Sequence, residues 1–112
     1  MEDDSLLSGK ILFEVPTPLG FAVRTTVSYW TLISTTKHPG MRDRLEDVRK
    51  TLSGPDEVRG SKTDAQVYLF YRGDGQSRWV CAVTKQIDNV SGFLITAYRT
   101  SAVKEGEVLW QK

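Results

Sequence analysis

The chain has 112 residues, of which 39% are hydrophobic and 26% are charged, and its formal net charge is +1 at pH 7. These values are typical of one globular domain and exclude a fibrous or an intrinsically disordered chain. The longest apolar runs, 67–71 and 79–83, are far shorter than the roughly 20 residues that a membrane-spanning helix needs. We therefore predict no membrane partner. The acidic start of the chain and its single cysteine favour a cytoplasmic protein.

The first predicted elements are a flexible tail over residues 1–9 and a β-hairpin. Residues 10–15 and 21–27 are rich in β-branched and aromatic types, and the turn residues of Pro16–Gly20 lie between them. Ser28 is the expected N-cap of a short helix, which ends before Pro39 because the residue preceding a proline is disfavoured in helical geometry.

A second helix is predicted from an apolar stripe at intervals of four, three and four residues, formed by Met41, Leu45, Val48 and Leu52. Strands are predicted at 67–72, 78–85 and 93–99, with a weaker one at 56–61. The short Gly, Asp and Asn-rich turns between these strands indicate antiparallel hairpins.

Residues 10–112 are therefore expected to form a single α+β domain. Its two N-terminal helices would pack on one face of a mostly antiparallel sheet of about four strands, with the N-terminal β-hairpin preceding them. In the last strand, alternation separates two sets of residues: Phe93, Ile95 and Ala97, and Leu94, Thr96 and Tyr98. We expect the first set to face the helices and the second set to lie on the uncovered face.

Several chemistries are excluded by residue type. One histidine and one cysteine do not make a zinc site, and no phosphate loop or dinucleotide motif is present. Cys81 lies in an apolar run, which favours burial over nucleophilic reactivity. We predict neither a metal nor a cofactor.

His38, the only histidine, lies between the predicted helices among basic residues. RNA cleavage without a metal needs a proton acceptor, a proton donor and positive charge on the phosphate. His38 can transfer the proton, and Lys37, Arg42 and Arg44 are candidate RNA-binding residues. A lone histidine at a helix end is more often a capping or surface residue, and this alternative stays open.

Five short motifs, in this order, resemble the phage-associated branch of the barnase–EndoU–colicin–RelE-like nuclease superfamily. They are Tyr29-Trp30, Lys37-His38-Pro39, Pro55-Asp56-Glu57-Val58, Val67–Arg72 and Phe93-Leu94-Ile95-Thr96-Ala97-Tyr98. The resemblance implies helices followed by a four-stranded antiparallel sheet with RNA on its open face. It also implies a metal-independent endoribonuclease, such as a toxin or a phage-derived nuclease, with RNA and a cognate antitoxin or immunity protein as partners.

The same resemblance implies roles for individual residues. His38 would act as general acid or base, and Thr96 and Tyr98 would bind or orient the phosphate. Arg72 and Arg99 would offset charge in the transition state.

Two other functions remain open. One is a non-catalytic module that binds RNA or a protein through the same face. The other is an interaction domain in which His38 and Tyr98 are structural. Convergence of His38, Thr96, Tyr98 and an arginine in one cleft would argue against the purely structural alternative.

Overall fold

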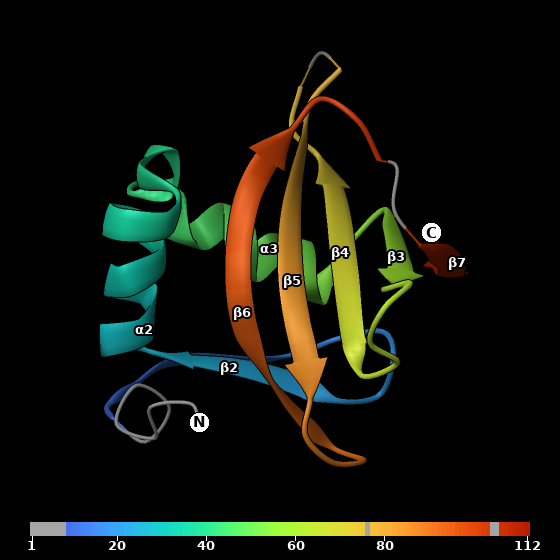
Figure 1. The fold of residues 1–112 in the computed structure, drawn as a ribbon, viewed down its shortest axis with the longest axis horizontal. Coiled ribbons are helices and arrows are strands. Elements are labelled where there is room, and N and C mark those ends of the chain that lie inside the picture. The colour runs from blue at the N-terminus through green and yellow to red at the C-terminus, as the bar shows by residue number, and fades with distance from the viewer. Residues whose placement is uncertain (1–8, 76, 104–105) are drawn as a thin grey trace.

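The computed structural model describes residues 9–75, 77–103 and 106–112. Its main element is a seven-stranded sheet with the order β1-β2-β6-β5-β4-β3-β7 (Figure 1). The strands are β1 (Ile11–Pro16), β2 (Ala22–Thr26), β3 (Glu57–Gly60), β4 (Val67–Gly73), β5 (Trp79–Gln86), β6 (Ser91–Thr100) and β7 (Glu107–Gln111). The remaining elements are two short helices, α2 (Val27–Leu32) and α3 (Leu45–Ser53), a π-helical turn η1 (Ile33–Lys37) and a 3₁₀ turn η2 (Pro39–Met41). The expected tail at residues 1–9 lies, apart from Gly9, outside the described residues.

The predicted fold class is wrong in the size of the sheet and in the placement of the helices. The sheet has seven strands rather than about four, because the β1–β2 hairpin joins one side and β7 extends the other side beyond β3. The hairpin joins through a parallel pairing of β2 with β6, whereas the other neighbouring strands are antiparallel. Turn residues indicate hairpins between consecutive strands. A pairing of strands that are distant in the chain leaves no such local pattern.

The two helices do not share one face of the sheet. Figure 1 shows α3 behind β4, β5 and β6, with α2 to one side of β6. The parallel pairing of β2 with β6 ends at Arg24 and Phe93. Beyond these residues the two strands diverge: β2 continues to α2, whereas β6 continues beside β5. Trp30 of α2 and Ile33 of η1 are buried in the same apolar cluster as the residues under α3. The first helical segment therefore fills the gap beside the sheet.

Local sequence explains where both helices begin and which sides they bury. The N-cap of α2 is Thr26, not Ser28: the hydroxyl oxygen of Thr26 accepts from the Tyr29 N–H at 3.1 Å. Val48 and Leu52 of the predicted stripe are fully buried under the sheet. Met41 is also buried but belongs to η2, because the helix itself starts only at Leu45.

A β-bulge in β6 changes the predicted faces of that strand. Thr84 pairs with Leu94 and Val83 pairs with Thr96, so Ile95 is an extra residue on β6. Leu94 and Ala97 are consequently both buried on the α3 side. The prediction that Leu94 shares the uncovered face with Thr96 and Tyr98 is therefore wrong.

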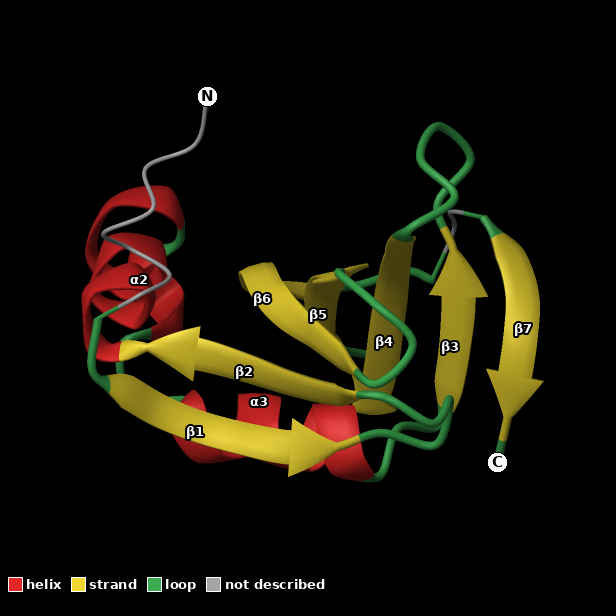
Figure 2. Ribbon diagram, turned by 90° about the horizontal axis from the view of Figure 1, so that it is seen from below, coloured by secondary structure: helices red, strands yellow, loops and turns green. Residues whose placement is uncertain are grey.

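The sheet separates a large apolar cluster under α3 from a smaller one on the opposite face. The smaller cluster contains the buried residues Leu69, Tyr71 and Cys81, packed against Trp79, Val83, Tyr98 and Val103. Burial of Cys81 confirms the prediction from its apolar neighbours. Figure 2 shows the sheet curving so that this second face lies between α2 on one side and β3 and β7 on the other.

Candidate functional site

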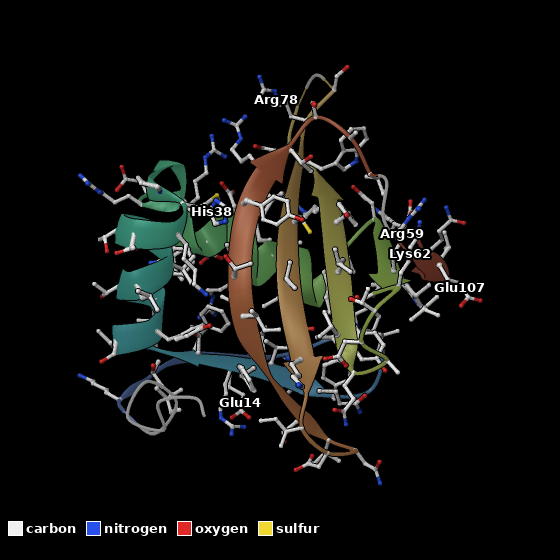
Figure 3. All side chains as sticks on the ribbon, viewed as in Figure 1. Glu14, His38, Arg59, Lys62, Arg78 and Glu107 are labelled. Carbon is white, nitrogen blue, oxygen red and sulfur yellow. The ribbon has the colours of Figure 1, made fainter. Side chains whose placement is uncertain are left out.

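His38 lies between η1 and η2, beside β6 (Figure 3). Its φ of −144° and ψ of 80° lie outside the helical region, as expected for a residue that precedes proline. Its N–H donates to the Ile33 carbonyl at 2.7 Å, and its own carbonyl accepts from the Met41 N–H at 2.9 Å. The backbone of His38 is therefore held on both sides, which restricts the directions that its side chain can take.

The imidazole of His38 contacts Tyr98 of β6. The two ring centroids are 5.4 Å apart and the ring planes are inclined by 42°, a separation at which aromatic rings are in contact. A cleft of about 370 Å³ lies between residues 37–41 on one side and Tyr98 and Arg99 on the other. His38 and Tyr98 are both half-buried, so each keeps part of its surface accessible to a ligand in the cleft.

Lys37 also lines this cleft, but its ammonium group is bonded to the protein. Nζ donates to the Ile95 carbonyl at 3.3 Å and to the Tyr29 hydroxyl at 3.2 Å, and it lies 5.1 Å from the centre of the Tyr29 ring. Since Ile95 is the bulged residue, Lys37 connects the end of η1 to the bulge of β6. A phosphate contact from Lys37 would have to compete with these bonds.

Arg99 lines the cleft as well, and it belongs to a network of ion pairs. Oδ2 of Asp74, in the turn between β4 and β5, accepts from Arg99 Nε at 2.8 Å and from Arg44 Nη1 at 3.0 Å. Arg44 Nη1 also donates to Asp47 Oδ2 at 3.0 Å. With two guanidinium groups and two carboxylates, the network carries no net charge.

The sequence around Asp74 predicts only a turn and gives no indication of its ion pairs. Its ion pair with Arg99 joins residues 25 positions apart, and such a contact leaves no spacing signal. The pair between Arg44 and Asp47 spans three positions and could have been predicted from helical periodicity.

The remaining candidate residues lie outside the cleft. Arg42 is exposed and lines a neighbouring cavity of about 560 Å³, together with Arg44 and Asp47. Arg72 lies on β4, two strands away from Tyr98 on β6, and is not among the described residues that line the cleft. Thr96 shares the face of Tyr98, but its hydroxyl oxygen is buried and has no hydrogen-bond partner among the described residues.

The structure thus brings Lys37 and His38 together with Tyr98 and Arg99, although the two pairs are far apart in the chain. No three His, Cys, Asp or Glu side chains gather as a possible metal site within residues 9–75, 77–103 and 106–112. In the same ranges, none of the helices is long and apolar enough to cross a membrane.

The comparisons with known proteins identify no relative of this chain. No family model, no curated protein and no solved structure matches. The function of the cleft must therefore be inferred from the cleft itself.

Proposed function

We propose that the cleft between His38 and Tyr98 binds an RNA phosphodiester and that His38 takes part in cleaving it. The observation that carries the proposal is the convergence of an imidazole, a phenol ring and the cations of Lys37 and Arg99 on one cleft. Imidazole transfers protons at physiological pH, and arginine binds phosphate oxygens through paired N–H groups. The motif resemblance to RNA-cleaving nucleases supports the same reaction.

Proton transfer and charge neutralisation are the two tasks in this reaction. The 2′-hydroxyl attacks phosphorus and loses its proton, while the bond to the 5′ oxygen breaks and that oxygen gains a proton. The products are a 2′,3′-cyclic phosphate and a 5′-hydroxyl. His38 performs one of the two proton transfers and a water molecule performs the other. The Tyr98 hydroxyl orients the phosphate, and Arg99 offsets its negative charge.

A second function, binding of RNA without cleavage, is favoured by the charge balance around the cleft. Asp47 and Asp74 neutralise Arg44 and Arg99, and Lys37 is bonded to Ile95 and Tyr29. These contacts leave little positive charge to stabilise a transition state. In this alternative the same cleft holds a nucleotide, and the ring of Tyr98 is a surface on which a base stacks.

The deciding experiment is incubation of the purified protein with labelled single-stranded RNA in the presence of EDTA. The proposal predicts cleavage by the wild type, a rate lower by about 10²–10⁴-fold in His38→Ala, and loss of cleavage in Tyr98→Phe. Lys62→Ala is the control, because Lys62 is an exposed cation near β3, across the width of the sheet from His38 (Figure 3).

The substrate supplies a further control, since single-stranded DNA of the same sequence has no 2′-hydroxyl to attack phosphorus and should remain intact. Undiminished cleavage in both His38→Ala and Tyr98→Phe would refute the site. A wild-type protein that binds RNA but leaves it intact would favour the second function.

A further inference from the structure

The turn between β4 and β5 carries a carboxylate that contacts two arginines from distant parts of the chain. The N–H of Asp74 donates to the Arg78 carbonyl at 2.8 Å. Gly75 follows with a φ of 89°, a conformation that glycine adopts without strain. The closed turn holds the Asp74 carboxylate between Arg99 on β6 and Arg44 before α3.

Asp74 occupies only one edge of the Arg99 guanidinium. Its Oδ2 accepts the Nε–H at 2.8 Å, and none of the described residues forms a hydrogen bond with the terminal nitrogens Nη1 and Nη2. The Arg99 side chain is 35% exposed and lines the cleft beside His38. A guanidinium held at Nε presents its two Nη groups as a fork that fits phosphate oxygens.

An arginine without a partner samples many rotamers, and a ligand that orders it must overcome the lost entropy. We infer that Asp74 is a positioning residue: it orders Arg99 before the ligand arrives and directs the terminal nitrogens of Arg99 towards the cleft. The inference rests on the proposed function of the cleft. It deepens that function by adding a residue that acts through Arg99 and is not part of the cleft wall.

An effect of net charge and an effect of positioning predict opposite changes in anion affinity when the Asp74 carboxylate is removed. If net charge alone decided the affinity, removing a carboxylate near the cleft would strengthen the binding of an anion. If Asp74 positions Arg99, the same removal weakens binding.

Asp43 is the matched control for the charge effect. It is exposed, it lines the cavity that shares Pro39 and Gly40 with the cleft, and it forms no ion pair with the described residues. Asp43→Asn therefore removes the same charge from the same region without releasing an arginine.

The test measures binding of fluorescein-labelled single-stranded RNA by anisotropy in EDTA, together with the cleavage rate. We expect Asp74→Asn to weaken binding by about 3–10-fold and Asp43→Asn to leave it unchanged or strengthen it. In the Arg99→Ala background, Asp74→Asn should have no further effect, because the residue through which it acts is gone. NMR should show a slowly exchanging Arg99 Nε–H in the wild type and faster exchange in Asp74→Asn, because a neutral amide oxygen holds the guanidinium less strongly than a carboxylate does.

Each alternative outcome has a definite meaning. An Asp74→Asn protein that binds and cleaves at least as well as the wild type overturns the inference alone, as does an additive effect in the double variant. A wild type that neither binds nor cleaves RNA overturns the proposed function and the inference together. If Asp74→Asn does not fold, Arg99→Lys replaces it: lysine keeps the charge but has no Nε–H for Asp74 and no fork. Binding by Arg99→Lys as tight as that of the wild type overturns the inference.

Discussion

Among the glycines within the described strands, Gly92 has the least room for an added side chain. It is buried where β2 and β6 run parallel, and it pairs with Val23. A Cβ at this position would come within 2.8 Å of the Lys85 carbonyl oxygen and 3.1 Å of the Phe21 ring. Because the carbonyl belongs to the backbone of β5, it cannot rotate away.

We therefore expect Gly92→Ala to lower the free energy of unfolding by about 1–3 kcal/mol in denaturant titrations. Gly40→Ala is the control, since a Cβ on Gly40 would meet nothing within 4 Å, and we expect a change of less than about 0.5 kcal/mol. Equal losses in the two variants would contradict the steric explanation.

Asp88 is a second residue whose contacts lead to a measurable property. Its Oδ1 accepts from the Val90 N–H at 2.9 Å, the Ser91 N–H at 2.8 Å and the Ser91 hydroxyl at 2.9 Å. The backbone hydrogen bond from Val90, followed by that from the Ser91 hydroxyl, lowers the pKa of Asp88. Because the pKa is lower in the folded state, the stabilisation is present at neutral pH and is lost as the pH falls through the folded-state pKa.

An NMR titration of the Asp88 carboxyl carbon should therefore give a midpoint below that of aspartate in an unstructured peptide. Asp88→Asn accepts hydrogen bonds but does not titrate, so it should remove this part of the acid dependence of stability. A midpoint at or above the peptide value would show that the turn does not hold the carboxylate as described.

At the scale of elements, the start of α2 distinguishes two neighbouring hydroxyls. Thr26 caps the helix through Tyr29, whereas Ser28 is exposed within the first turn. We expect Thr26→Val to lower the free energy of unfolding by about 1–2 kcal/mol, because the Tyr29 N–H loses its acceptor. Ser28→Ala should change it by less than about 0.5 kcal/mol. Thermal or denaturant unfolding of the two variants compares them directly, and a larger loss in Ser28→Ala would reverse the assignment.

The elements that sequence predicts correctly are those with strong local patterns. The β1–β2 hairpin, the strands β4 to β6 and the apolar stripe around Val48 all have such patterns. The sequence does not predict the strand β7. Its apolar alternation is interrupted by Leu109, which has no partner on β3, and its pairing partner is distant in the chain.

The candidate site shows the same division between local and distant information. The His-Pro position of His38 and its non-helical backbone follow from neighbouring residues. Its contact with Tyr98 was expected only from the order of motifs, not from any spacing. The bulge at Ile95 and the ion pair between Asp74 and Arg99 depend on strand register and side-chain reach, and a single sequence encodes neither in a periodic form.

At the scale of the whole molecule, both edges of the sheet are irregular. On β1, Leu12 is an extra residue between the paired Ile11 and Phe13, and Pro16 has no N–H to donate. On β7, Leu109 is the extra residue, and its side chain lies over Gly60. Bulges and prolines at an edge disfavour the addition of a further strand.

We therefore expect the protein to be monomeric at micromolar concentrations, with a mass of one chain in light scattering after size exclusion. Deletion of Leu109 would make the β7 edge regular and should increase self-association. A concentration-dependent dimer of the wild type would show that another surface, or the edge itself, pairs despite the bulges.

The neutrality of the ion-pair network determines how the molecule responds to ionic strength. A protein that binds nucleic acid with unpaired lysines and arginines displaces many condensed counterions, and its affinity falls steeply with added salt. Arg44 and Arg99 already have carboxylate partners, so a ligand in the cleft should displace only one or two ions. The corresponding slope of log K against log salt is about −0.7 to −1.4 for a single strand. Such a cleft would be little attracted to polyanions in general and would select its ligand by shape and by the chemistry at His38.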